Sequence, residues 1–384
     1  MLTYRERRRM RILVTGGAGF IGSALIWELN QRGFDDILVA DRLGTGEKWR
    51  HLVPLRFRDY VEADDLAKIL GETPGKLDEI STVFHLGACS STTENDASYL
   101  IRNNFGYTKM LAEWAVGKGR RFVYASSGAT YGAREHGLRE DLEPSELRPL
   151  NKYGFSKHIF DVYAARSGIL DRIVGLKYFN VYGPNEDHKG DMRSVVHKAY
   201  ESITRDGWVG LFKSYRAEIA DGEQTRDFIY VKDAVAMTVH LANTPSARGL
   251  FNLGSGTART WLDLVGAVFT AMGRKPDIRF IEMPEVLRGR YQYATQASID
   301  KLRSTGYDRP ITSLEDGISD YVRGYLIPGR SLGDQPVVDQ PVGDKPVGGE
   351  PVVDQPIGDE PVGDKPVVDG AAGDAAARIL SSRA

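Results

Sequence analysis

A tyrosine and a lysine four residues apart, Tyr153 and Lys157, have the side chains and the spacing needed to transfer a proton. On a helix, this spacing brings both side chains onto the same face. A neighbouring ammonium group stabilises a tyrosinate, so that a phenol beside it can exchange a proton near neutral pH. The same spacing arises by chance on many helices, so the pair alone does not establish a catalytic site.

Hydroxyl side chains precede this pair in the stretch 124–132, which reads YASSGATYG. The apolar residues at its start predict a strand over Phe122–Ser127, so Ser127 comes at the carboxyl end of a sheet strand. Ligands of open α/β sheets bind at that edge of the sheet. We therefore expect Ser127 to hydrogen-bond a substrate hydroxyl beside Tyr153.

A glycine-rich turn near the start of the chain predicts a second ligand. Gly16, Gly19 and Gly22 are spaced GxxGxxG between the apolar run 11–14 and the helical pattern 23–29. Glycine permits such a tight turn and lets the main chain approach a pyrophosphate at the positive end of a helix. The strand–turn–helix context favours a dinucleotide site over an ordinary turn.

The acid expected to bind the ribose of that dinucleotide is Asp41, which ends the next apolar run. An acid at this distance from the glycine turn favours the free 2′-hydroxyl of NAD. Arg42 and Lys48 follow it, and their cations suit the 2′-phosphate of NADP. These residues alone leave the choice between NAD and NADP open.

The elements that position these residues follow an alternation of apolar runs and helical patterns. This alternation predicts an α/β fold with a doubly wound parallel Rossmann sheet, because strands covered by helices on both faces are apolar throughout. Expected strands are Ile12–Thr15, Ile37–Asp41, Thr82–Gly87, Phe122–Ser127, Arg172–Tyr178, Arg226–Val231 and Leu250–Gly254, the last two returning to the main sheet. Expected helices include Ala97–Lys118 and Asn151–Arg166.

This pattern divides the chain into four parts. We expect residues 10–181, with 227–260, to form the dinucleotide-binding domain, and 182–226 with 261–328 to form a smaller substrate domain. Residues 1–9 are expected to be a disordered extension, with Met10 as an alternative start. Residues 329–384 are expected to form a low-complexity tail. From Pro336 this tail repeats every five residues in the manner of PVVDQ, and regular proline removes hydrogen-bond donors.

Composition limits the partners of the protein. Across 384 residues the net charge is −2, which gives no reason to expect a nucleic-acid or membrane surface. No apolar run is long enough to span a bilayer. The only cysteine, Cys89, leaves no internal disulfide, and the histidines show no metal-ligand spacing, so no metal is expected. A cytoplasmic location is the expectation.

Taken together, the glycine turn, the Ser127 strand end and the Tyr153–Lys157 pair resemble the extended short-chain dehydrogenase/reductase superfamily over roughly residues 10–328. Three further stretches resemble one family within it, the ADP-L-glycero-D-manno-heptose 6-epimerases. They are CSSTTE from Cys89, the HKG loop at 188–190, and GRYQ from Gly289.

The resemblance implies a reaction and a second acid/base group. The family converts ADP-D-glycero-β-D-manno-heptose to its L-glycero epimer, in the synthesis of the lipopolysaccharide inner core. Hydride leaves C6 for NADP and returns to the other face, so two acid/base groups are useful. Tyr153 would be one and Lys189 the other. The resemblance also implies a homo-oligomer, with a pentamer among the expected assemblies.

The remaining site residues are carried over from the same resemblance. The cofactor would be lined by Gly16, Gly19, Phe20, Ile21, Gly22, Asp41, Arg42, Lys48, Leu86, Gly87, Ala88, Cys89, Ser90, Asn103, Lys157, Val181 and Lys189. The substrate would face Asn180, Asp191, Lys198, Phe212, Lys213, Ser214, Tyr215, Arg226 and Tyr291. Asp191 departs from the family pattern, because a carboxylate beside a diphosphate is unfavourable unless it is paired or turned away.

Two alternatives remain from the sequence. A UDP-sugar 4-epimerase would share Ser127, Tyr153 and Lys157 but gives no reason for the Lys189 loop. A non-catalytic NADP-binding sensor belongs to a different class, and such proteins often lack the tyrosine or the lysine that this chain keeps. A nucleotide-sugar 4,6-dehydratase is disfavoured, because no carboxylate follows Ser127 in the stretch 128–130.

Overall fold

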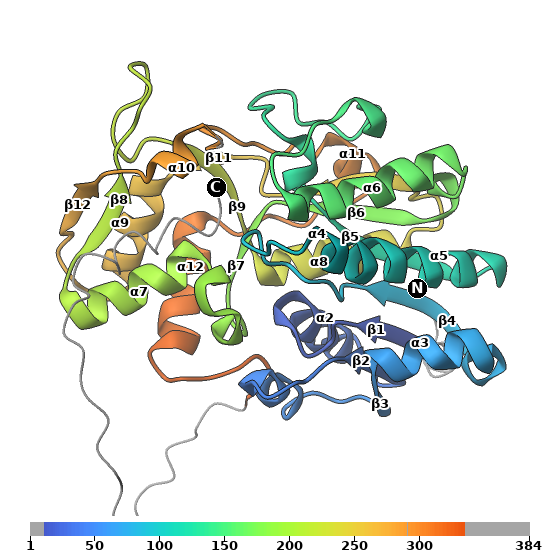
Figure 1. Ribbon diagram of the computed structural model, residues 1–384. Helices are drawn as coiled ribbons and strands as arrows, with labels where there is room; N and C mark the ends of the chain where they lie inside the picture. The colour runs from blue at the N-terminus through green and yellow to red at the C-terminus, as the bar shows by residue number, and fades with distance from the viewer. Residues whose placement is uncertain (1–10, 290, 335–384) are drawn as a thin grey trace, which may run out of the picture.

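The computed structural model describes residues 11–289 and 291–334, and these are built around a seven-stranded sheet (Figure 1). All of its strand pairs are parallel, in the order β10-β6-β5-β4-β1-β2-β3. The strands are β1 (Arg11–Thr15), β2 (Ile37–Asp41), β3 (Asp59–Glu62), β4 (Ile80–His85), β5 (Arg121–Ser127), β6 (Val174–Tyr178) and β10 (Gly249–Leu253). This order confirms the doubly wound prediction.

Helices cover both faces of the sheet, so the sheet lies in the core (Figure 1). One apolar cluster joins the sheet to α2 (Phe20–Gln31) and α8 (Val231–Asn243). The other joins it to α3 (Ala63–Glu72), α5 (Tyr107–Gly117) and α6 (Lys152–Arg166). This arrangement explains why the strands read as apolar on both faces.

The strand order reverses between β1 and β4, which places a switch point beside the glycine turn. Thr15 pairs in register with His85, and His85 pairs with Tyr124. The Oγ1 of Thr15 and the Nδ1 of His85 are 2.6 Å apart, which ties the two strand ends together. Open α/β sheets bind ligands at such a point, outside the carboxyl ends of the strands.

One expected strand of the main sheet lies elsewhere. The prediction that Arg226–Val231 returns to the main sheet is wrong, because β9 (Thr225–Tyr230) lies between β7 (Asn180–Tyr182) and β11 (Ala258–Thr260) in a separate three-stranded sheet. An apolar run predicts a buried strand but does not say which sheet it joins. Of the two returning runs, β10 alone joins the main sheet, beside β6.

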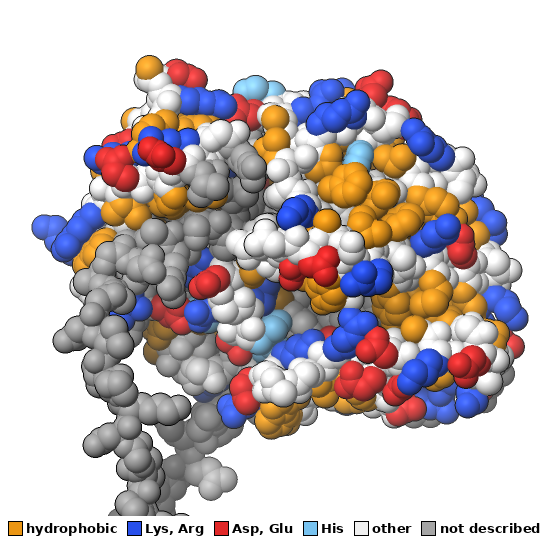
Figure 2. All heavy atoms as spheres, in the orientation of Figure 1, with side chains coloured by type: hydrophobic (Ala, Val, Ile, Leu, Met, Phe, Trp, Pro, Cys, Tyr) orange, Lys and Arg blue, Asp and Glu red, His pale blue; other side chains and the backbone are white. Residues whose placement is uncertain are grey.

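The later segments build a smaller unit next to the sheet. It contains β8 (Val209–Phe212) paired in parallel with β12 (Ile278–Ile281). Its helices are α7 (Val195–Asp206), α9 (Trp261–Ala271), α10 (Glu285–Arg288) and α12 (Leu314–Tyr321). The short helix α11 (Asp300–Ser304) lies instead against β10 of the main sheet, where Lys301 Nζ donates to the carbonyl oxygen of Leu250 at 2.6 Å. Among the described residues, no helix is long and apolar enough to cross a membrane. Acidic and basic side chains are interspersed on the face that Figure 2 shows.

The expected terminal segments, 1–9 and 329–384, lie wholly or mostly outside the residues that the structure describes. The predicted extension 1–9 and the repeats after Pro336 lie outside the described residues. The first residues of the expected tail are folded, since Leu332 is fully buried and its backbone N donates to Asn185 Oδ1 at 2.9 Å. The domain boundaries otherwise stay predictions.

A buried ion pair holds α6 against the sheet and yields a stability prediction. Lys177 Nζ lies 2.7 Å from Asp161 Oδ2, and both residues are fully buried. Asp161 also accepts hydrogen bonds from Tyr124 and Ser126, each at 2.8 Å. Replacing one partner of such a pair leaves an uncompensated charge in the core.

We expect Asp161→Ala to lower the free energy of unfolding by roughly 3–5 kcal/mol, because the Lys177 ammonium would stay buried without its partner. Urea denaturation followed by circular dichroism measures this change. Asp141→Ala is the control, since that carboxylate pairs with Arg139 in solvent and should leave the midpoint unchanged. Equal effects of the two substitutions would contradict the prediction.

Candidate active site

A cavity of about 370 Å³ opens at the carboxyl edge of the main sheet, beside the glycine turn. It brings together most of the residues that the sequence predicts for the cofactor and for proton transfer. The predicted residues that line it are Gly16, Gly19, Phe20, Ile21, Gly22, Asp41, Lys48, Leu86, Gly87, Ala88, Ser90, Ser127, Tyr153, Lys157, Asn180, Val181, Lys189 and Arg226.

The glycine turn forms a cradle with no room for side chains. Gly16 has a φ of +71°, and a Cβ on it would lie 2.6 Å from the backbone of Gly87. A Cβ on Gly22 would lie 1.9 Å from the carbonyl oxygen of Gly16. The turn leads into α2, whose first backbone N–H groups suit an anion. The residues therefore fit a pyrophosphate held against bare backbone.

Asp41 binds the backbone of the glycine turn. Its carboxylate accepts hydrogen bonds from the backbone N of Ala18 at 2.8 Å and from Lys48 Nζ at 2.6 Å. Arg42 instead donates to Asp64 and, at 2.6 Å, to Asn103 Oδ1. Arg42 and Asn103 are outside the residues that line the cavity, whereas Asp41 and Lys48 line it. The choice between NAD and NADP stays open on this geometry.

The Tyr153–Lys157 pair enters the cavity from the first turns of α6. Asn151 caps this helix, its Oδ1 accepting from the backbone N of Gly154 at 2.7 Å. Lys157 is 5% exposed, and its ammonium donates to the carbonyl oxygen of Ala125 at 2.9 Å. Burial lowers the pKa of Lys157 to about 8, so the group keeps its charge at neutral pH.

Ser127 lies where β5 ends, as expected. Its Oγ accepts a hydrogen bond from the backbone N of Ala129 at 3.1 Å and so caps the short turn Gly128–Tyr131. A hydroxyl that accepts one hydrogen bond can still donate its own hydrogen, and Ser127 lines the cavity. This arrangement suits a hydrogen bond from Ser127 to a substrate oxygen.

Lys189 reaches the same cavity from a different element, the 3₁₀ segment η7 (Asp187–Met192). Its ammonium lies 5.2 Å from the ring centroid of Phe20, the first residue of α2. Its backbone N donates to the carbonyl oxygen of Glu186 at 3.1 Å. Tyr153 and Lys189, the two residues predicted to transfer protons, therefore line one cavity from separate parts of the fold.

Arg226 contributes a buried cation to the cavity wall. It is 2% exposed, and burial lowers the pKa of its guanidinium. Its Nη1 donates to the carbonyl oxygen of Thr225 at 2.8 Å, but its Nη2 has no hydrogen-bond partner among the described residues. The neighbouring Asp227 is bound elsewhere, by the backbone of Ser255, Gly256 and Ala297. An anionic ligand would satisfy the unused donor.

A second cavity, of about 470 Å³, shares Gln292 with the first and takes in two of the predicted substrate residues, Tyr215 and Tyr291. Two guanidinium groups line it beside aromatic rings: Arg288 lies 4.0 Å from the ring centroid of Tyr215 and Arg216 lies 4.1 Å from that of Tyr293. Because Gln292 lines both, the two cavities are neighbours.

Other predicted residues lie outside both linings. Asp191 is exposed, whereas Lys198 in α7 and Phe212 in β8 are buried. The backbone N of Cys89 donates to the side chain of Asn104. Lys213 pairs with Glu282 at 2.6 Å, and the backbone N of Ser214 donates to Asp221. Each of these residues is engaged with neighbouring protein groups or faces solvent. Their expected ligand contacts therefore stay predictions.

Sequence reasoning missed several residues of the site. Asn104, fully buried in the π-helical turn Ile101–Gly106, donates to Cys89 O and to Ser156 Oγ, each at 2.9 Å, and so holds the loop after β4 against α6. Gln292 and Thr295 line the first cavity. Gln292 belongs to the GRYQ stretch of the family resemblance, which could have signalled it, whereas nothing local marks Asn104.

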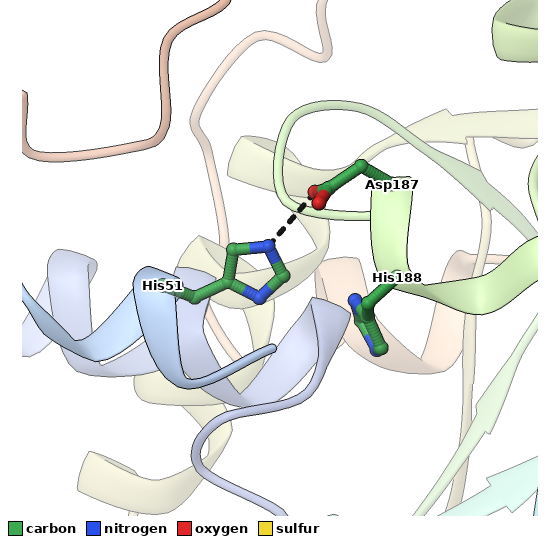
Figure 3. A group of neighbouring side chains, drawn as sticks. All are labelled: His51, Asp187 and His188. Carbon is green, nitrogen blue, oxygen red and sulfur yellow. Dashed lines mark hydrogen bonds and ion pairs between the residues drawn. The ribbon is translucent and has the colours of Figure 1, made fainter. Parts of the chain in front are cut away.

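A cluster that the sequence did not predict lies beside the cavity. One potential metal-ligand atom from each of His51, Asp187 and His188 lies within 4.8 Å of the other two (Figure 3). His51 and Asp187 are 136 positions apart, so no local spacing could reveal the cluster. Two of these residues already interact directly, because His51 Nε2 lies at hydrogen-bond distance, 2.8 Å, from Asp187 Oδ1.

Comparison with known proteins agrees with this geometry. The model of the NAD dependent epimerase/dehydratase family matches residues 12–254. The chain belongs to this family. It is 53% identical over 317 residues to the ADP-L-glycero-D-manno-heptose-6-epimerase of Nitratidesulfovibrio vulgaris strain DP4, which covers 82% of this chain and 97% of the relative. The prediction of an epimerase, an isomerase by reaction class, is thereby confirmed.

Solved structures of the same family superpose on most of the chain. The Helicobacter pylori ADP-L-glycero-D-manno-heptose-6-epimerase has a TM-score of 0.67 and 27% identity, covering 84% of this chain and 99% of that one. A Thermus thermophilus UDP-glucose 4-epimerase in complex with NAD has a TM-score of 0.65 and 29% identity, covering 82% and 98%. A nicotinamide dinucleotide is accordingly the cofactor class that this family member uses.

The buried ammonium of Lys157 makes stability depend on pH. The pKa is about 8 in the folded chain and 10.5 for an ordinary lysine, so between these values the unfolded chain binds more protons. The cost of burying the charge is therefore complete below pH 8 and fades as the pH rises toward 10.5. We expect the wild type to gain roughly 2 kcal/mol relative to Lys157→Met between pH 7 and 9.5.

Urea denaturation of both proteins at the two pH values measures this gain, because other titrating groups cancel in the difference. Lys68→Met, which removes an exposed lysine of α3, is the control and should show the same dependence as the wild type. A difference between wild type and Lys157→Met that does not change with pH would contradict the assigned burial of charge.

Proposed function

We propose that this protein epimerises ADP-D-glycero-β-D-manno-heptose at C6 to the L-glycero epimer, using NADP. One observation carries the proposal: Tyr153 and Lys189 line a single cavity although they come from α6 and η7. A reaction that deprotonates and reprotonates one hydroxyl in two orientations needs two such groups. The relatives named above as heptose epimerases support this choice of substrate.

The residues divide the work around the glycine cradle. The glycine turn and the residues around it would hold the nicotinamide dinucleotide, which would supply the redox chemistry, hydride transfer from and back to C6. Tyr153 removes the proton from the C6 hydroxyl in one orientation of the sugar, and Lys189 serves in the other. The Lys157 ammonium favours the ionised form of Tyr153, and Ser127 holds the reacting oxygen by a hydrogen bond.

The substrate's diphosphate has a natural partner in Arg226. Arg226 lines the cavity, and its buried Nη2, which has no partner among the described residues, would donate to an anionic oxygen of the diphosphate. Beyond it, the second cavity offers Arg216 and Arg288 beside Tyr293 and Tyr215, which suit the stacking and charge of a nucleotide. Of the two cofactors, NADP is favoured by the resemblance to the heptose epimerases, and Lys48, which lines the cavity and pairs with Asp41, is a cation that suits a 2′-phosphate; NAD is the alternative.

Further parts of the proposal concern the setting of the enzyme. Lipopolysaccharide inner-core synthesis follows from the substrate, and a cytoplasmic location suits a chain with a single cysteine. A homo-oligomer is supported by apolar side chains that gather over α5 and α6 in Figure 2. Phe155, 47% exposed, and the half-buried Phe105 and Tyr163 belong to these helices and the turn before them. Exposed apolar patches of this kind mark association surfaces.

A UDP-sugar 4-epimerase is the second candidate. It is favoured by the Thermus thermophilus structure, whose TM-score is close to that of the heptose epimerase. A 4-epimerase needs Tyr153 but not Lys189, so one substitution separates the two reactions. A cofactor-binding sensor without turnover would need neither.

We expect purified protein to convert ADP-D-glycero-β-D-manno-heptose to the L-glycero epimer, detected by NMR or chromatography. Tyr153→Phe and Lys189→Met should each lower kcat by about 10²–10⁴-fold, because each removes one acid/base group. The matched controls are Tyr163→Phe on the same helix and Lys68→Met, whose side chains lie outside the cavity. Both controls should retain full activity.

The outcomes separate the candidates. Loss in Tyr153→Phe with full activity in Lys189→Met would remove the two-base assignment. No epimer from the wild type, together with turnover of UDP-glucose to UDP-galactose, would replace the heptose reaction by the 4-epimerase. Cofactor binding without turnover of either substrate would favour the sensor.

A further inference from the structure

A buried histidine joins the cofactor cradle to the segment that carries Lys189. His51 is 1% exposed and lies in the 3₁₀ turn η1 (Glu47–Leu52). Its Nδ1 is 3.0 Å from the carbonyl oxygen of Ala18 in the glycine turn, and its Nε2 is 2.8 Å from Asp187 Oδ1 in η7 (Figure 3). One side chain therefore connects two segments that lie far apart in the sequence.

Both partners of His51 can only accept hydrogen bonds. A backbone carbonyl and an ionised carboxylate have no hydrogen to donate, so the imidazole is the donor in the bond to Asp187. A hydrogen bond to an ionised carboxylate is charge-assisted and therefore among the stronger ones. Burial raises the pKa of Asp187, but the hydrogen bond and the charge of His51 outweigh this effect and lower it below its usual value.

The hydrogen bond between His51 and Asp187 lies close in the sequence to Lys189. Asp187 is the first residue of η7, and Lys189 follows two residues later in the same short segment. The preceding residue, Glu186, is fully buried, and its Oε1 accepts a hydrogen bond from Ser194 Oγ at 2.6 Å. Glu186 therefore fixes η7 to α7, whereas the bond between Asp187 and His51 fixes it to the glycine turn. Just before η7, Asn185 Nδ2 donates to Ser23 Oγ of α2 at 3.0 Å, so Asp187 is the attachment that lies nearer to Lys189 in the sequence.

A second bond anchors η1 itself. Lys48 lies in the same turn as His51 and pairs with Asp41 at 2.6 Å, while Asp41 also accepts from the backbone N of Ala18. The backbone N–H and the carbonyl of Ala18 are thus held by Asp41 and His51, respectively. Because two residues of η1, Lys48 and His51, connect it to the glycine turn, the position of His51 relative to that turn is fixed. Asp187 therefore bonds to a side chain that is itself held in place.

We infer that His51 and Asp187 form a latch that positions Lys189 over the cofactor cradle. They are positioning residues rather than catalytic ones, since they act through η7. The inference rests on the proposed function for the role of Lys189, but the latch itself is a structural property. Displacing a reacting group by about 1 Å can cost on the order of 100-fold in rate, so such a latch would act on kcat.

A divalent cation shared by His51, Asp187 and His188 is the competing occupant. The Nδ1 of His188 is buried without a hydrogen-bond partner among the described residues, and the donor atoms lie close together. The surroundings oppose it, because Lys48 and Lys189 bring positive charge to the cluster. A direct ion pair between His51 and Asp187 suits this environment better than a further dication.

The test compares Asp187→Ala and Asp187→Asn with the wild type and with Asp141→Ala, an exposed carboxylate remote from the cavity. Asp187 is half exposed, so its replacement leaves the core intact. We expect Asp187→Ala to lower kcat about 10–100-fold while KM for ADP-heptose changes less than about 2-fold. Asp187→Asn keeps an oxygen acceptor for Nε2 and should restore part of kcat. Asp141→Ala should match the wild type.

Hydrogen exchange gives a readout that does not need turnover. The backbone N–H groups of Lys189 and Arg193 should exchange faster in Asp187→Ala than in the wild type, and an intermediate rate is expected for Asp187→Asn. If the wild type epimerises nothing, the proposed function fails, and exchange alone decides on the latch. Unchanged exchange, or a loss of kcat without faster exchange, would overturn the inference.

Elemental analysis of the purified wild type decides between the two occupants. No stoichiometric metal, and full activity after dialysis against a chelator, is the result expected of the ion pair. One equivalent of zinc or another divalent cation per chain, lost on chelation together with activity, would overturn the ion pair in favour of a metal site.

Discussion

The close approach of bare backbone at the glycine turn is the constraint on which the rest of the site depends. A Cβ on Gly22 would lie 1.9 Å from the carbonyl oxygen of Gly16, and one on Gly16 would meet Gly87 at 2.6 Å. Because no side chain intervenes, the turn presses against the loop after β4 and leaves its own backbone facing the cavity. The middle of the turn, Ala18, then serves as a hub: Asp41 binds its N–H, and His51 is bound to its carbonyl.

The residues proposed to transfer protons reach the cavity from two separate elements. Tyr153 and Lys157 come from a capped helix that is held to the sheet through the buried Asp161–Lys177 pair. Lys189 comes from η7, which Glu186 and Asp187 attach to different neighbours. Burial lowers the pKa of Lys157 and makes its ammonium destabilising to the fold, which is the cost expected if Lys157 promotes the ionisation of Tyr153 as proposed.

The features that the sequence predicts correctly are local ones. The glycine turn, the Ser127 strand end and the Tyr153–Lys157 pair each depend on residues within a few positions of one another, and the structure brings them into one cavity. What the sequence does not predict depends on long-range packing. The run at 226–231 is a buried strand as expected, but its partners β7 and β11 are set by tertiary contacts. His51 meets Asp187 across 136 positions for the same reason.

The central claim is that one carbon is oxidised and then reduced within a single site, and isotopic labelling tests it most directly. ADP-D-glycero-β-D-manno-heptose carrying deuterium at C6 would be epimerised in ordinary water and the product examined by NMR. Full retention of deuterium at C6 of the L-glycero product is the predicted result, because the label would leave and return as hydride without meeting solvent. Replacement of the deuterium by solvent hydrogen would show that C6 is inverted by proton abstraction, and would contradict the roles assigned to the glycine cradle, Tyr153 and Lys189.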